Sequence, residues 1–225
     1  MEWTPRPRPV GVPLSGRTCR LVPLDIAEHG VGLHAAFSAA TDDGDWRYLP
    51  YGPFAAEADF LRWLGATASD DPLFYTIIAN NLSGPAGLIA LMRIDAPNGV
   101  LEIGHVHFSR VLQRSPPATE AVFLLLSHAF DDLGYRRVEW KCDAAHMGSR
   151  RAAERLGFGL EGAFRQHRVV KGRNRDTTWF SILDREWPEK KSAFVRWLDP
   201  SNFDVEGRQL TALGLAAQSA PRPSA

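Results

Sequence analysis

Short apolar or alternating runs separated by polar loops make up the first third of this chain. Residues 17–24 alternate loosely between apolar and polar side chains and predict a first strand. Asp25 follows in the position of a helix N-cap, and the spacing of apolar residues after it predicts a helix over 26–39. A second helix is expected at about 55–68, with its apolar residues on one side.

The next part of the chain is rich in β-forming residues. Residues 73–79, 86–94 and 100–108 each predict a strand. The turns between them, NNLSGP and APNG, are short, and short turns join antiparallel neighbours. The three strands therefore predict an antiparallel meander.

Helices and strands alternate in the second half. The strongly apolar residues 118–133 predict a helix that is buried on more than one side. A strand at 137–142 and a short helix at 149–156 follow, and 162–170 pairs with 177–183 in a closing hairpin. The order β-α-α-β-β-β-α-β-α-β-β predicts an α/β (α+β) fold with a mixed, mostly antiparallel sheet and helices on both faces.

The two ends of the chain do not follow this pattern. Four prolines make residues 1–13 extended, and a further helix is expected from 186 to about 213. The last residues, AAQSAPRPSA, have the composition of a disordered tail. We therefore predict a proline-rich arm (1–16), a main domain (17–187), a helical extension (188–213) and a disordered tail (214–225).

The composition is that of an ordinary globular protein. The 26 basic and 26 acidic side chains give no formal net charge, which argues against a general DNA or membrane-surface binder. The polar, proline-rich start does not resemble a signal peptide, and no apolar run approaches the roughly 18 residues of a membrane span. Cys19 and Cys142 have no metal-ligand spacing, so we expect two reduced, buried thiols, or one disulfide, in a cytoplasmic protein.

Most of the candidate chemistry lies between residues 101 and 158. An apolar strand there ends in the loop QRSPPAT at 113–119, which opens a helix. Free backbone N–H groups and the positive end of the helix dipole converge at such a point, so the loop is a candidate cradle for phosphate. A loop that only connects strand to helix is the alternative.

Several short motifs accompany this loop in a fixed order. They are EIG at 102–104, LQR at 112–114, ATEA at 118–121, SRR at 149–151, ERLGF at 154–158, EG at 161–162, Asp176 and EW at 186–187. In this order and spacing, over residues 17–187, they resemble the GCN5-related N-acetyltransferase (GNAT) superfamily and its RimJ/RimL-like branch.

The resemblance implies acetyl-CoA as the acyl-donor co-substrate. Pantetheine would lie in the opening between the parallel strands 100–108 and 137–142, and the diphosphate on 113–119. The cofactor-binding residues that it implies are His107, Phe108, Gln113, Arg114, Ser115, Ala118, Thr119, His146, Ser149 and Arg151. Family loops usually read Gln/Arg-x-x-Gly-x-Gly/Ala, whereas residues 114–118 have no glycine and Pro116 and Pro117 lack an N–H. Arg114 and the hydroxyls of Ser115 and Thr119 are the expected replacements.

Ser149 matches a serine that lies near the CoA sulfur in this branch, while His146 stands where the family usually has asparagine. A hydroxyl near the sulfur could protonate the departing thiolate. Alternatively, Ser149 is the N-cap of its helix.

An amine acceptor also needs a base to remove its proton, and the strand at 100–108 offers Glu102, His105 and His107. Strict alternation places the two histidines on one face and Glu102 on the other, although the bulge of the family at this strand could reorient them. Glu102, His105 and Ser149 are the catalytic candidates. The histidine pair has no evident third ligand, so we expect no metal site.

Two further segments suggest recognition. The loop at 45–54 concentrates aromatic side chains, which either form a wall of the acceptor site or cap the core. The residues predicted to contact the acceptor are Trp46, Tyr48, Tyr51, Phe54, His105 and Arg165. The hairpin at 165–176 carries five arginine or lysine residues, which indicates either a ribosome-facing surface or a solvated turn with Asp176 paired to an arginine.

The sequence thus predicts an N-acetyltransferase that moves an acetyl group directly from acetyl-CoA to a small-molecule or peptide amine, such as an amino acid or a protein N-terminus. No motif supplies a nucleophile for a covalent intermediate. A non-catalytic CoA- or metabolite-binding module is the alternative, because the loop lacks glycine. The C-terminal helix either covers the acceptor groove or forms a homodimer contact.

Overall fold

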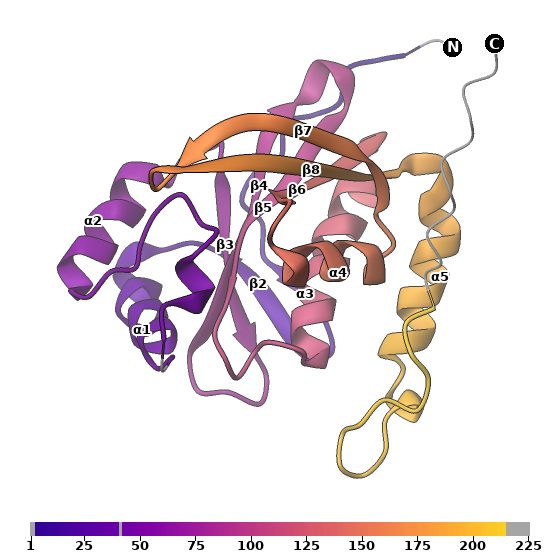
Figure 1. Ribbon diagram of the computed structural model, residues 1–225. Helices are drawn as coiled ribbons and strands as arrows, with labels where there is room; N and C mark the ends of the chain where they lie inside the picture. Colours follow the sequence, from indigo (N-terminus) through magenta and orange to yellow (C-terminus); the bar gives the residue numbers. More distant parts are fainter. Residues whose placement is uncertain (1–2, 41, 215–225) are drawn as a thin grey trace.

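The computed structural model describes residues 3–40 and 42–214. Within these residues the strands form one eight-stranded sheet in the order β1-β2-β3-β4-β5-β6-β8-β7 (Figure 1). The strands are β1 (Leu14–Ser15), β2 (Cys19–Pro23), β3 (Leu73–Ala79), β4 (Pro85–Asp95), β5 (Val100–Phe108), β6 (Arg137–Asp143), β7 (Gly159–Val170) and β8 (Arg173–Leu183). The helices are α1 (Ile26–Ser38), α2 (Glu57–Thr67), α3 (Pro116–Ser127), α4 (Met147–Arg155) and α5 (Trp187–Leu198).

The sheet is mixed and mostly antiparallel, as predicted. Strands β3, β4 and β5 form the expected antiparallel meander. Strands β5 and β6 run parallel, and their register holds only from the pair Val100 and Arg137 to the pair Glu102 and Glu139. Beyond Glu102 the two strands part, which opens one end of the sheet.

Helices cover both faces of the sheet, again as predicted (Figure 1). Leu33 of α1 and Phe60 of α2 are buried in one apolar cluster on the first face. Leu125 of α3 and Phe194 of α5 are buried in a larger cluster on the second face, to which α4 contributes Ala153. No helix within the described residues has the length and apolarity needed to cross a membrane.

Several helix boundaries differ from the sequence expectation, and two of the differences have a clear physical cause. Helix α3 begins at Pro116, two residues early, because proline is well tolerated in the first turn, where its missing N–H would have no partner. Helix α5 ends at Leu198 rather than near 213, and Pro200 follows, which disfavours continuation of the helix. The chain then makes a short 3-10 turn (Pro200–Asn202) and a single bridge between Phe203 and Gln209.

The predicted division into parts remains a prediction, but the structure shows where its outer parts lie. The extended arm packs on the body through bonds from the Tyr135 hydroxyl to the Pro7 carbonyl (3.1 Å) and from the Arg6 N–H to the Ala96 carbonyl (3.0 Å). The predicted disordered tail, apart from Gly214, falls outside the described residues.

Glu120 of the ATEA motif ties α3 to the start of β2. Its side chain is buried and accepts hydrogen bonds from the backbone N–H groups of Arg17 (2.8 Å), Thr18 (2.6 Å) and Cys19 (2.9 Å). Several N–H donors satisfy a buried carboxylate well. This contact fixes the first turn of α3 and, with it, the loop that precedes the helix.

Candidate functional site

A bulge re-aims the side chains of β5 where β5 and β6 part. Ile89 of β4 lies opposite both His105 and Val106, and His105 has a φ of 49°. A second irregularity in β4 leaves Arg93 with a φ of 50°. Bulges are frequent next to active sites because the extra residue redirects its neighbours.

The bulge changes the predicted separation of the candidate bases. Glu102 pairs with Met92, and His107 pairs with Leu88, two residues that point to the α1–α2 face of β4. Strict alternation along a regular strand would have placed Glu102 and His107 on opposite faces. In the structure the bulge at His105 brings Glu102 and the histidines to one face, as the resemblance to the family allowed and strict alternation did not.

Glu102 is buried within a cluster of charged side chains. Lys141 Nζ lies 3.0 Å and Arg93 Nε 3.4 Å from its Oε2 atom, and Lys141 also contacts Glu139 (2.6 Å). Burial raises the pKa of Glu102, and the positive charges of Lys141 and Arg93 partly oppose this rise. Glu102 is therefore a more basic carboxylate than usual, and the charges of Lys141 and Arg93 still stabilise its ionised form.

The two histidines are held neutral by burial. The Tyr51 hydroxyl lies 2.9 Å from Nδ1 of His105, and burial lowers the pKa of His105 to about 4, with a smaller contribution from Arg93. His107 stacks on Phe37 at 4.0 Å between ring centroids, and burial lowers its pKa to about 4 as well. Neutral imidazoles of such low pKa are weak bases, so their positions favour contact roles over proton transfer.

A cleft of about 880 Å³ opens beside the parted strands. Its walls come from β5, the loop before α3, the start of α4 and the segment after α5. The residues predicted to bind the cofactor all line it, namely His107, Phe108, Gln113, Arg114, Ser115, Ala118, Thr119, His146, Ser149 and Arg151. The structure thus brings together residues that are up to 44 positions apart in the sequence.

The cleft carries an excess of positive charge. Arg114, Arg151 and Arg155 line it, and none of them forms an ion pair with a carboxylate among the described residues. Asp45, the carboxylate in the lining, is paired with Arg110 at 2.8 Å. Unpaired guanidinium groups in a cleft favour an anionic ligand.

The loop before α3 offers fewer backbone donors than a helix N-terminus normally would. Pro116 and Pro117 occupy its first turn and have no N–H, and the N–H of Ala118 already faces the Ser115 hydroxyl at 3.4 Å. That hydroxyl also donates to the Leu112 carbonyl (2.5 Å). Ser115 is therefore engaged in capping, which weakens the expectation that its hydroxyl replaces the lost phosphate contacts.

His146, not Ser149, caps α4. The N–H of Ser149 faces His146 Nδ1 at 3.4 Å, so the N-cap reading of Ser149 was wrong. The indole N–H of Trp140 donates to Ser149 Oγ at 3.0 Å, and Ser149 also forms a side-chain hydrogen bond with Cys142, which partly opposes the rise that burial causes in the pKa of that thiol. The ring of Tyr48 stacks on His146, with 4.4 Å between centroids, so it contacts a residue of the cleft lining.

The predicted acceptor residues separate into two groups. Trp46 is buried and packs with Phe54 and Tyr51 in the cluster under α1 and α2, as the core-capping interpretation expected. Tyr51 nevertheless reaches His105, so it borders the bulge. Arg165 is exposed on β7, and no contact joins it to the others among the described residues.

The tip of the β7–β8 hairpin holds the aromatic loop in place. Lys171 Nζ donates to the Trp46 carbonyl (2.8 Å), and Arg173 donates to the Arg47 carbonyl (3.1 Å). Asp176 accepts from the backbone N–H of Gln166 and from Asn174 rather than from an arginine, which corrects the predicted pairing.

Sequence reasoning missed Lys141 and Arg155. Lys141 belongs to a run of alternating charged and apolar residues along β6, in which residues 137, 139, 141 and 143 are charged. That alternation was a readable signal for a charged face beside Glu102. Arg155 lies within the ERLGF motif, but its place in the cleft was not expected, because its neighbours there come from distant parts of the chain.

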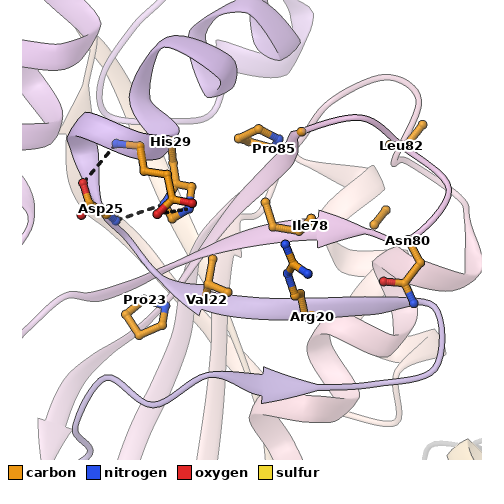
Figure 2. Close-up of a pocket in the computed structure, with 12 residues that line it drawn as sticks. Arg20, Val22, Pro23, Asp25, His29, Ile78, Asn80, Leu82 and Pro85 are labelled. Carbon is orange, nitrogen blue, oxygen red and sulfur yellow. Dashed lines mark hydrogen bonds and ion pairs between the residues drawn. The ribbon is translucent and has the colours of Figure 1, made fainter.

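A second hollow of about 740 Å³ lies away from this cleft, between β2, β3 and the start of α1 (Figure 2). Its acidic and imidazole groups are engaged locally. Asp25 caps α1, and His29 accepts from the Asp25 N–H and lies 3.7 Å from Glu28 (Figure 2). Across the described residues, no three His, Cys, Asp or Glu side chains gather as a metal site. The parted strands therefore hold the best candidate site.

Comparison with known proteins shows the family to which the chain belongs. A family model described as an acetyltransferase (GNAT) domain matches residues 20–159. The chain belongs to the GNAT acetyltransferase family. A solved GCN5-related N-acetyltransferase from Brucella melitensis is 51% identical to this GNAT protein, with a TM-score of 0.91, and the match covers 94% of this chain and 96% of that one.

More distant relatives agree with the RimJ/RimL-like resemblance. The "Putative ribosomal N-acetyltransferase YdaF" of Bacillus subtilis is 32% identical over 105 residues, which is 47% of this chain and 57% of that protein. The chain thus matches little more than half the length of that curated relative. A structure of RimL, described as a ribosomal L7/L12 alpha-N-protein acetyltransferase in complex with coenzyme A, shares the fold at 19% identity, with a TM-score of 0.62 over 77% of this chain and 99% of that one.

Proposed function

We propose that this GNAT protein transfers an acetyl group from acetyl-CoA directly to an amine of a small molecule, an amino acid or a protein N-terminus. One observation carries the proposal. The basic cleft lies against the parted edge of β5, and the buried carboxylate of Glu102 stands at the last pair before the strands part. Family membership supports the same reaction class.

The residues of the cleft fit an acyl-CoA. Beyond Glu102, β5 has no register partner on its β6 side, so the backbone at 106–108 can pair with the amides of pantetheine. Gln113, Arg114 and Arg151 line the part of the cleft that suits the phosphates. When bound, acetyl-CoA supplies the activated acyl group.

Within this proposal, Glu102 accepts the proton of the ammonium acceptor, because burial raises its pKa while Lys141 and Arg93 support its charge. Ser149 offers its hydroxyl hydrogen to the departing thiolate. Cys142 is buried, and burial raises the pKa of its thiol, which disfavours a covalent route through cysteine.

The proposal is tested by adding acetyl-CoA and a library of amines, amino acids and N-terminal peptides and measuring the release of free CoA thiol. We expect acetyl-CoA to raise the melting temperature and at least one amine class to release thiol above the acetyl-CoA-only control. A raised melting temperature with no thiol release across the library would favour the non-catalytic CoA-binding module instead.

The partners and the location belong to the same proposal. Two free, buried cysteines support a cytoplasmic protein. Contact with the ribosome through the 165–176 hairpin predicts salt-sensitive binding, and charge reversal of the exposed Arg165 and Arg168 should abolish it. A homodimer remains a prediction, which sedimentation of the full chain would test.

A further inference from the structure

The end of α5 and the chain after it form one wall of the cofactor cleft. Trp197, Phe203 and Gln209 all line it. The indole N–H of Trp197 donates to the Gln209 side-chain oxygen (2.9 Å), and the Asn202 amide donates to the Trp197 carbonyl (3.0 Å). These bonds hold the segment after α5 against the end of that helix. The C-terminal extension thus lines the cofactor cleft, a role that was not expected for it, while the acceptor-groove cover and the dimer contact stay predictions.

Arg155 is the cation that meets this wall. It is the last residue of α4, and its Nη1 donates to the Thr119 hydroxyl of α3 at 3.1 Å. Its guanidinium carbon lies 4.9 Å from the centre of the Trp197 ring, which is the geometry of a cation–π contact. Arg155 is therefore oriented by two elements and remains accessible from the cleft.

The charge of Arg155 has no carboxylate partner among the described residues, unlike that of the neighbouring Arg208. Arg208 pairs with Asp204 at 2.8 Å and with Glu206 at 2.7 Å, so its charge is already compensated. The carboxylates of the segment after α5 thus pair with Arg208 and not with Arg155, so the guanidinium of Arg155 can bind an anion.

The loop before α3 lacks backbone donors for a phosphate, so a nearby cation could take their place. Pro116 and Pro117 supply no N–H, and the Ser115 hydroxyl occupies the N–H of Ala118. A phosphate in this cleft therefore needs donors from elsewhere. Arg155 lies beside Thr119, one turn into the same helix, and can supply a pair of N–H donors in a fixed geometry.

We propose that Arg155 and the segment around Trp197 and Phe203 form the nucleotide subsite of the cleft, in which Arg155 binds a phosphate of CoA and the aromatic side chains contact the adenine. This inference rests on the proposed function, since it assumes that the cleft takes CoA. The phosphate is either the diphosphate or the 3′-phosphate, and both have the same chemistry towards a guanidinium.

Isothermal titration of the full chain with CoA and with dephospho-CoA tests the subsite. We expect Arg155→Gln to weaken CoA binding roughly 10- to 100-fold, as is typical when a charged hydrogen bond is lost. An equal loss for dephospho-CoA identifies the diphosphate as the ligand of Arg155, and a loss confined to CoA identifies the 3′-phosphate. The matched control Arg196→Gln, on the exposed side of α5, should bind both ligands as the wild type does.

Two further variants guard against a folding defect. Arg155→Lys keeps the charge and the aliphatic stem, so it should retain the wild-type melting temperature and bind CoA more weakly than the wild type but more tightly than Arg155→Gln. Phe203→Ala should weaken CoA and dephospho-CoA alike, by roughly 5-fold or more, if its ring contacts the adenine.

If Arg155→Gln and Arg155→Lys both fold and bind CoA within 2-fold of the wild type, the subsite is refuted while the proposed function stands. Wild-type protein that binds neither CoA nor dephospho-CoA would instead overturn both proposals.

Discussion

At the scale of single residues, Glu102 is a buried carboxylate that lies between the cations Lys141 and Arg93. We expect Glu102→Gln to lower kcat by roughly 10²- to 10⁴-fold, the usual contribution of a positioned base, with little change in the KM for acetyl-CoA. Because burial raises the pKa of Glu102, the acidic limb of the wild-type kcat profile should lie above pH 4.5, and the variant should lack that limb. Steady-state kinetics over a pH series measures both.

Glu139→Gln serves as the control for Glu102→Gln. It also removes a carboxylate that contacts Lys141, so it perturbs the same charge cluster without removing the proposed base. A Glu102→Gln enzyme with wild-type kcat would show that the base is another group.

The neutral histidines predict how stability depends on pH. His105 and His107 have pKa values of about 4 in the folded protein, below the value of 6.5 expected for an unfolded chain. The unfolded state therefore binds more protons between pH 6.5 and 4, and stability falls as the pH drops through this window. From pH 7 to 5 we expect a loss of about 2 kcal/mol for each histidine, measured by urea unfolding.

His107→Gln should flatten that dependence by about the share of one histidine, because the variant side chain does not titrate. His167→Gln is the comparison: the pKa of His167 is also lowered, by burial and by Arg168 and Arg175, but less than that of His107, so its removal should flatten the slope less. Equal slopes for the wild type and His107→Gln would contradict the assignment.

The sequence allowed us to predict which residues line the cleft, but not which side chains surround each of them. The ten cofactor-binding candidates were expected from motif resemblance, and all of them line the cleft. The partners of Glu102 were not expected, because Arg93 and Lys141 come from the two strands on either side of it. Contacts between neighbouring strands can be predicted only when the register of their pairing is known.

At the scale of elements, two prolines occupy the first turn of α3 and remove backbone N–H donors where the loop 113–119 meets the helix. Pro116→Ala restores an N–H in the first helical turn, so we expect CoA to bind roughly 3- to 10-fold more tightly. The variant should also lose roughly 0.4–1 kcal/mol of stability, because proline restricts the unfolded chain. Calorimetric titration and thermal melting measure the two effects.

The control Pro188→Ala changes a proline in the first turn of α5. It should cost a similar amount of stability and leave CoA affinity unchanged. Unaltered or weaker CoA binding by Pro116→Ala would mean that this loop does not contact phosphate through its backbone.

The sequence predicted which segments form helices and which form strands, but it predicted bulges and helix ends less well. The bounds of β3 and β5 agree with the expected 73–79 and 100–108. The bulge at His105 was indicated only by the family resemblance, because a bulge exists relative to its pairing partner, here Ile89 of β4, and alternation along one strand does not show it. The end of α5 was missed although Pro200 was visible, because apolar residues continued beyond it.

At the scale of the whole molecule, the β7–β8 hairpin reaches across to the loop between α1 and α2. Lys171 donates to the Trp46 carbonyl, and this contact holds the aromatic loop beside the bulge. We expect Lys171→Met to raise the KM for the amine acceptor roughly 3- to 10-fold and to leave the KM for acetyl-CoA within 2-fold. Initial rates with each substrate varied in turn make the comparison.

Arg168→Met, at an exposed position of β7, is the matched control and should leave both constants unchanged. Equal rises in both KM values for Lys171→Met would indicate a general loosening of the fold rather than a role in acceptor binding.

Local pattern along the chain was enough to predict the order of elements, the antiparallel meander and the mixed sheet, because periodicity and turn residues act over a few positions. Motif order was enough to indicate the family. The common face of Glu102 and His107, the capping role of His146 and the meeting of Arg155 with Trp197 depend on register, bulges and packing between distant segments. Such contacts are set by the pairing of whole elements, which no local pattern records.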